Sequence, residues 1–103
     1  MTKALFIPAD DNLPEEIRNL DGLDDYQAAV GGMIETVPVW GRKVVYFNEE
    51  GKILGLPKNN RATELVFGLG GRLYDGDFIA GDMIVLDFDE ETGEDLDFSG
   101  LSV

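Results

Sequence analysis

Short apolar runs separated by turn-forming residues predict a succession of short strands and helices along this chain. The consecutive apolar residues within 3–8 are typical of a strand that is covered on both faces. Residues 33–39 and 42–47 are rich in β-branched and aromatic side chains, and only Trp40 and Gly41 separate them. Because a parallel return needs a crossover of about a dozen or more residues, these runs are predicted to form an antiparallel hairpin, with a helix packed on one face.

Helices are predicted where capping residues and glycines bound an apolar stripe. Pro14, followed by two glutamates, is typical of the first turn of a short helix. A second helix is predicted over residues 23–30, where two aspartates lie near the start and two glycines follow the end. A third helix is predicted to begin at a cap on Asn59 or Asn60 and to run to Phe67.

Extended segments are also predicted over residues 52–56 and 78–88, the second of them interrupted at residues 80–82. Helices and strands alternate without a repeated βαβ rhythm, which favours an α+β fold with a mostly antiparallel sheet and two or three short helices. The length of 103 residues suits one small domain over residues 1–103. The C-terminal end is expected to be an acidic tail, and residues 89–103 are the candidates for a mobile part of it.

Composition and charge argue against several classes of function. The chain has 21 acidic and 8 basic residues, and its formal net charge of -13 argues against direct binding of nucleic acid or of anionic membranes. With no Cys and no His, thiol chemistry and His-dependent triads are excluded, and Ser99 and Ser102 have no His to activate them. We therefore expect no enzyme activity, no catalytic residue, no metal and no cofactor. No apolar run suits a signal peptide or a membrane span, so a cytoplasmic protein is expected.

The acidic residues concentrate near the end of the chain, where residues 75–103 hold ten acidic and no basic residues. Asp87 and Asp89 resemble the start of a calcium-binding loop, but Thr92 and Phe98 stand where that loop needs Gly and Glu, which argues against a calcium site. Two interpretations stay open: a solvated surface that aids solubility, or a negatively charged surface for a basic partner. The candidate partner surface consists of Asp87, Asp89, Glu90, Glu91, Glu94 and Asp95.

The middle of the chain is locally basic, since residues 41–74 hold six basic and three acidic residues. These cations either bind an anion near a helix N-terminus or pair with the surrounding acidic residues. Gly51 is predicted to adopt a positive φ in a tight turn. Glu35 is predicted to point outward or to pair with Arg42 or Lys43. A ligand or partner site in this region would consist of Glu35, Asn48, Glu49, Lys52, Asn59 and Arg61.

Three segments resemble one family in their order and spacing: YQAAVGGMIETV at residues 26–37, FNEEGK at 47–52 and GLPKNNRAT at 55–63. The chain is similar to the domain of unknown function numbered thirty-eight forty-six, which is common in actinobacterial phages, plasmids and other mobile elements. The resemblance implies such an origin and supplies no reaction or ligand. An apparent insertion over residues 68–76 and a more acidic C-terminal end depart from the family pattern.

The charge, the residue types and this resemblance together predict an accessory protein of a phage or mobile element that has no enzymatic activity. We expect it to bind a host protein in the host cytoplasm, in host takeover or against host defence, with acidic imitation of DNA as one route. The alternative is a module that binds a small ligand or a nucleotide on the motif face around residues 48–61.

Overall fold

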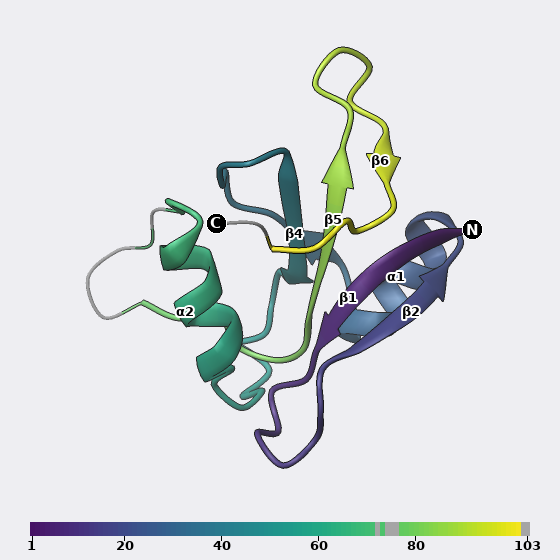
Figure 1. Ribbon diagram of the computed structural model, residues 1–103. Helices are drawn as coiled ribbons and strands as arrows, with labels where there is room; N and C mark the ends of the chain where they lie inside the picture. The colour runs from purple at the N-terminus through teal and green to yellow at the C-terminus, as the bar shows by residue number, and fades with distance from the viewer. Residues whose placement is uncertain (72, 74–76, 102–103) are drawn as a thin grey trace.

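The computed structural model describes residues 1–71, 73 and 77–101. The strands form one sheet in the order β2-β1-β5-β4-β3, with β6 added to β5, and the paired strands are antiparallel (Figure 1). The predicted mostly antiparallel sheet with short helices is therefore confirmed, with two helices in the part of the chain that is described. The elements are β1 (Thr2–Ile7), β2 (Glu16–Leu20), α1 (Gly22–Val30), β3 (Ile34–Glu35), β4 (Lys43–Asn48), α2 (Asn60–Gly68), β5 (Met83–Phe88) and β6 (Asp95–Leu96).

The central strand β5 is buried on both faces because each helix lies against a different face of the sheet. Met83 and Val85 belong to the core on the α2 side, where Val66 of that helix packs. Ile84 belongs to the core on the other side, together with Tyr26 of α1. Since side chains alternate along a strand, one continuous apolar run supplies both cores.

Most of the predicted elements are present. The strand predicted over residues 3–8 is β1, the helix over 23–30 is α1, and the helix that follows Asn59 is α2. The strand predicted over 78–88 begins at Met83, after the interruption that the sequence marks, and is followed by the additional short strand β6.

The predicted helix at Pro14 is wrong, because the residues that follow it form the edge strand β2. This strand pairs with β1, with Glu16 opposite Phe6, and the Arg18 guanidinium lies 3.5 Å from the centre of the Phe6 ring. Pairing with the preceding strand outweighs the local preference of Pro and Glu for a helix start. The extended segment predicted over residues 52–56 is also wrong, since these residues lie in a series of turns.

The predicted hairpin is confirmed in its antiparallel direction but is much shorter than expected. Only Ile34 and Glu35 pair with β4, opposite Asn48 and Phe47. Beyond them the chain leaves the sheet, and Val37 packs against the core on the α2 side. The two strands are therefore joined by a wide loop rather than by a tight turn.

Two glycines in the family motifs have different physical roles. Gly31 ends α1 in the left-handed conformation with a φ of 82°, and its N–H donates to the Gln27 carbonyl at 2.8 Å. The positive φ predicted for Gly51 is wrong, because this residue is not among the glycines with positive φ. Gly51 is needed for space instead: an added Cβ would lie 2.6 Å from the Ala80 carbonyl oxygen.

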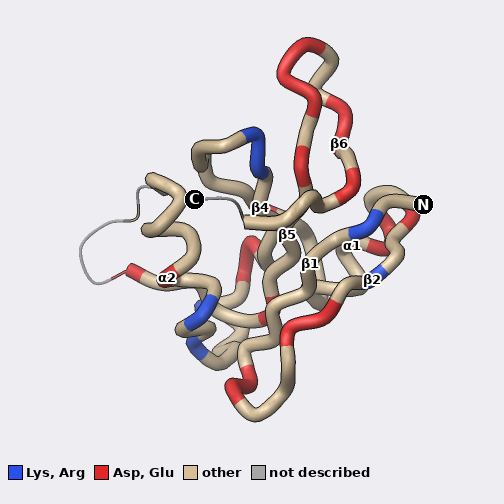
Figure 2. Tube along the Cα trace, in the orientation of Figure 1, with Lys and Arg blue, Asp and Glu red and all other residues tan. Residues whose placement is uncertain are grey.

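The acidic end of the chain folds back on the sheet. After β5 the chain turns and returns as β6, and this acidic arm, residues 87–97, projects beyond the rest of the molecule (Figure 2). Further along, the Phe98 N–H donates to the Lys3 carbonyl at 2.8 Å, and the Phe98 ring packs against the core on the α2 side. The segment expected as an acidic tail is thus an arm followed by a stretch held against β1, and residues 102–103 lie outside the described part.

Candidate functional site

Asn48, one of the predicted site residues, is buried and holds the end of α1 against the turn after β4. Its Nδ2 donates to the Val30 carbonyl at 3.2 Å, and its Oδ1 accepts from the Glu50 N–H at 2.8 Å. The motif that contains two glycines before β3 also depends on this side chain, because a Cβ on Gly32 would lie 2.9 Å from Asn48 Nδ2. These contacts of Asn48 give a structural reason for the glycines before β3 and for the turn after β4, which belong to two of the family motifs.

Asn59 is fully buried and joins three parts of the chain. Its Oδ1 accepts from the Ala62 N–H at 2.9 Å, which confirms the predicted N-cap of α2. Its Nδ2 donates to the carbonyls of Ile7 at 2.9 Å and Gly81 at 3.0 Å. The side chain thus fastens the start of α2 to the end of β1 and to the segment before β5.

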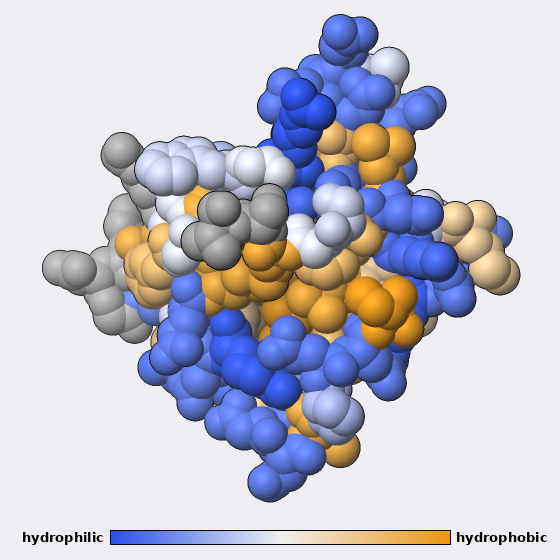
Figure 3. All heavy atoms as spheres, viewed as in Figure 1, coloured by the Kyte–Doolittle hydropathy of each residue, from blue (hydrophilic) through white to orange (hydrophobic). Residues whose placement is uncertain are grey.

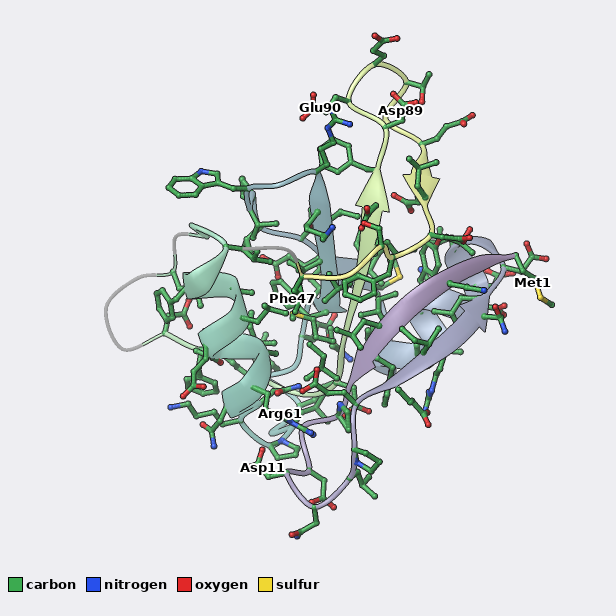
Figure 4. The ribbon with its side chains drawn as sticks, in the orientation of Figure 1. Met1, Asp11, Phe47, Arg61, Asp89 and Glu90 are labelled. Atoms are coloured by element: carbon green, nitrogen blue, oxygen red, sulfur yellow. The ribbon has the colours of Figure 1, made fainter. Side chains whose placement is uncertain are left out.

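Arg61 points toward the loop between β1 and β2, where its Nη2 donates to the carbonyls of Pro8 at 2.7 Å and Asp10 at 3.0 Å. The Asp11 carboxylate lies 3.8 Å from Arg61 Nε (Figure 4). In the orientation of Figure 1, hydrophobic residues gather across the middle of the molecular surface (Figure 3). Between α2 and β1, Arg61 lines a cavity of about 480 Å³ together with Leu65 and Leu101. Arg61 is therefore on a different cavity from the other charged residues of the predicted site.

The structure does bring four of the predicted site residues together, around a pocket of about 360 Å³ that we call the motif pocket: Glu35, Asn48, Glu49 and Lys52. It lies between the end of β4, the turns that follow β4 and the segment before β5. Lys52 forms an ion pair with Asp77, and its Nζ lies 5.0 Å from the centre of the Phe78 ring. The apolar residues of its wall are Val37, Phe47, Ile53, Leu73, Ile79 and Ala80.

Asp77 and Phe78 are the members of the motif pocket that the sequence analysis missed. Asp77 follows the glycine-rich stretch and Phe78 is the first residue of the extended segment predicted over 78–88, so little in their local pattern marks them as site residues. The sequence contains one indication of a binding role for them: an acidic and an aromatic residue stand next to each other at the start of a predicted extended segment. Neighbouring residues 72 and 74–76, part of the apparent insertion, lie outside the described residues.

Three of the six carboxylates of the predicted acidic surface accept hydrogen bonds, two of them from β4 and one from within the arm. Asp87 accepts from Lys43 Nζ at 2.8 Å, Asp89 Oδ1 accepts from the Glu91 N–H at 2.8 Å, and the Tyr46 hydroxyl donates to Asp95 Oδ1 at 3.0 Å. The carboxylates on the exposed turn belong to Glu90, Glu91 and Glu94. Of these, Glu90 lies 3.6 Å from Arg42 Nε. The outward-facing charge of the arm is therefore carried by its glutamates.

The electrostatics of the arm's base are set by burial and hydrogen bonding. Burial acts to raise the pKa of the Asp87 carboxyl, but hydrogen bonds from Lys43 and Ser99 outweigh it and lower that pKa. Burial, followed by the nearby Asp95 carboxylate, raises the pKa of Tyr46 far above its usual range. Tyr46 therefore stays protonated and donates to Asp95, while its ring stacks on Tyr26 with centroids 5.5 Å apart.

A second pocket, of about 350 Å³, lies beside the arm, and we call it the arm pocket. Its wall combines the loop after β3 with β4 and with the base of the arm. Asp95 and Lys43 contribute the ionisable groups, and Gly93 brings the arm's turn to the rim. The apolar and aromatic residues of its wall are Val37, Pro38, Val39, Val44, Tyr46 and Phe88.

The described residues form a small antiparallel sheet with a helix on each face and pockets lined by side chains of the sheet, the helices and the loops. A family model for a domain of unknown function (DUF3846) matches residues 1–101, so the chain belongs to this family. No curated protein and no solved structure matches the chain. Among the described residues, no group of three or more Asp, Glu, His or Cys side chains is arranged to hold a metal ion, and no helix is long and apolar enough to cross a membrane.

Proposed function

We propose that this protein is a binding module without enzymatic activity, and that the arm pocket and the acidic arm together dock a basic segment of a host protein. The observation that carries this proposal is that the acidic arm itself forms part of the wall of the arm pocket, through Phe88, Gly93 and Asp95, and that Glu94 lies between the last two in the chain. An apolar cavity flanked by one sign of charge suits a polypeptide that presents an apolar side chain between Lys or Arg residues.

The apolar half of this surface is provided by side chains that the helices do not cover completely. Val44 and Tyr46 pack only in part against the core on the α1 side, and both line the arm pocket. Phe88 extends the same wall toward the arm. An apolar side chain of a partner would therefore contact residues that are already held in place by the sheet.

The charged half of the surface favours a basic partner. Lys43 lines the arm pocket, but its ammonium group is neutralised by Asp87 at 2.8 Å. The exposed glutamates of the arm outnumber the nearby Arg42, which leaves the surface negative. Such a field raises the association rate of a basic partner and makes binding sensitive to salt.

The family resemblance to proteins of phages and mobile elements makes a host protein the natural partner. A host protein whose basic surface binds nucleic acid has the required chemistry, because the arm's carboxylates then take the place of phosphates. In this proposal the protein binds such a partner in the host cytoplasm and does not itself bind nucleic acid.

The test compares two triple variants that remove the same charge. Glu90→Gln/Glu91→Gln/Glu94→Gln neutralises the arm, and Glu15→Gln/Glu50→Gln/Glu64→Gln neutralises exposed glutamates elsewhere. Each is used with the wild type to capture proteins from host lysate and to bind synthetic peptides in which one Leu or Phe stands among Lys and Arg residues.

We expect the arm variant to lose the captured partner and the peptides, and to lose the salt dependence of binding, while the matched control binds like the wild type. Val44→Thr, which keeps the shape of the wall and makes it polar, should also weaken peptide binding. Equal binding and equal salt dependence in the arm variant and the control would show that the arm is not the docking surface.

A further inference from the structure

We propose that the motif pocket binds an aliphatic organic cation, an alkyl-ammonium or alkyl-guanidinium group, with its charge near Glu35 and Glu49 and its methylene chain against the apolar wall. Of its described residues, the motif pocket shares only Val37 with the arm pocket, and this proposal does not depend on the proposed docking function. Of the alternative stated above, a small ligand or a nucleotide on the motif face, it retains the small ligand and gives it a positive charge.

The charges around the motif pocket argue for a cation. Among the described residues that line the pocket, the carboxylates of Glu35, Glu49 and Asp77 outnumber the ammonium group of Lys52. Lys52 is paired with Asp77, so the other two carboxylates set the sign of the field inside the pocket. A phosphate group in this place would be repelled, whereas an ammonium or guanidinium group would gain charge-assisted hydrogen bonds.

The wall of the motif pocket suits the methylene chain of such a ligand. Phe47, Val37 and Ile79 are core or core-packed residues that present apolar surface to the cavity. A volume of about 360 Å³ lies within the range of small-molecule sites. A ligand with an apolar stem and a charged head would therefore find both kinds of surface in one cavity.

An ammonium group of the protein itself already lies at the pocket. Lys52 lines it, forms an ion pair with Asp77 and lies with its Nζ 5.0 Å from the centre of the Phe78 ring. Lys58, which is not among the residues of the pocket wall, lies with its Nζ 5.6 Å from the same ring. Phe78 is therefore an aromatic surface that attracts cations.

The two glutamates are carried by backbone that is held firmly. Glu35 lies in β3 opposite Phe47, and the Glu49 N–H donates to the Met33 carbonyl at 2.9 Å. Gly51 packs against the Ala80 carbonyl and fixes the next turn against the segment before β5. The backbone that carries the two carboxylates is therefore fixed by the sheet and its first turn rather than by a free loop.

The experiment measures binding to the full chain by calorimetry, with 1,5-diaminopentane and agmatine as cationic probes. The neutral 1,5-pentanediol, the dianion glutarate and adenosine monophosphate serve as probes of similar length or of opposite charge. The site variant is Glu35→Gln/Glu49→Gln. The matched control, Glu15→Gln/Glu64→Gln, removes the same charge from exposed positions away from the motif pocket.

We expect saturable binding of at least one cationic probe at millimolar concentration or below, and no binding of the diol or the anions. The site variant should weaken that binding by about tenfold or more, because it removes two charge-assisted contacts, while the control stays within about twofold of the wild type. Circular dichroism of both variants confirms that they are folded.

Two further probes distinguish the sources of the cation. If N-acetyl-lysine amide or N-acetyl-arginine amide binds more tightly than the diamine, the natural ligand is a side chain of a polypeptide, and the reverse order identifies a free polyamine. Equal weakening in the site variant and the control would show only general attraction to an acidic protein and would overturn the proposal. Binding of the anionic probes, or of no probe, would overturn it as well.

Discussion

Lys43 and Asp87 lie directly opposite each other on β4 and β5, and the Lys43 ammonium group is 2.8 Å from the Asp87 carboxylate. Only 7% of the Lys43 side chain is exposed, so this ion pair is what allows the positive charge to lie inside the fold. The Ser99 N–H also donates to Asp87, at 3.2 Å. One carboxylate therefore holds a buried lysine and the end of the chain at the base of the acidic arm.

Replacing Asp87 by Asn should lower the free energy of unfolding by about 2–4 kcal/mol, because it leaves the Lys43 ammonium group buried without a counter-charge. Urea denaturation followed by circular dichroism measures this loss. Glu91→Gln, which removes an exposed charge from the same arm, should change stability by less than about 0.5 kcal/mol. Equal unfolding midpoints for the two variants would contradict the role assigned to the pair.

The same carboxylate predicts a dependence of stability on pH. Since folding lowers the pKa of Asp87, its stabilising contribution is fully present above the ordinary carboxyl pKa of about 3.9 and is lost as the pH falls through the lowered value. The difference in stability between the wild type and Asp87→Asn should therefore shrink as the pH is lowered below about 4. Urea titrations of both proteins at several pH values measure it, and a constant difference would be inconsistent with the lowered pKa.

Asn59→Ala should destabilise the protein by about 2–4 kcal/mol. The substitution removes the N-cap of α2 and leaves the buried carbonyls of Ile7 and Gly81 without their donor. Asn60→Ala is the matched control, because Asn60 is the exposed next residue and Ala suits the start of a helix. A cost in the Asn59 variant no larger than in the control would show that the capping contacts contribute little.

Local chemistry predicts where the helices start and end, but it does not predict which strands pair. The cap at Asn59 and the glycine that ends α1 depend on neighbouring residues, and the structure confirms both. The strand after Pro14 forms because it pairs with β1, and Lys43 meets Asp87 because β4 pairs with β5. Neither pairing is evident from the residues around these positions.

For the candidate site, too, the sequence predicts some of the residues that come together and not others. Glu35, Glu49 and Lys52 come together because β3, β4 and the next turn follow one another in the chain. Arg61 is close to them in sequence, but α2 directs its side chain toward the loop after β1. Asp77 and Phe78 join the motif pocket only because their segment leads into the central strand, so their role required the three-dimensional structure.

Gly51→Ala should destabilise the protein by about 1–3 kcal/mol, because its new Cβ would meet the Ala80 carbonyl oxygen and force the turn away from the segment before β5. Gly68→Ala is the control, since nothing lies within 4 Å of an added Cβ there and its φ is not positive. That variant should be neutral or slightly more stable, because Ala suits the last residue of α2 better than Gly. Thermal unfolding of the two variants gives opposite shifts if close packing explains Gly51.

Adjacent valines in β4 test the two-sided burial of the sheet. Val45 is fully buried in the core on the α2 side, whereas Val44 is only partly buried on the other face, where it lines the arm pocket. Val45→Ala should therefore cost about 2–3 kcal/mol, since the lost methyl groups leave a cavity that the sheet cannot close, and Val44→Ala about 1 kcal/mol or less. Chemical denaturation of both variants measures the difference. Equal losses of stability in the two variants would mean that the α1 side of β4 is covered as completely as the α2 side. The arm pocket would then lack the accessible apolar wall on which the docking proposal depends.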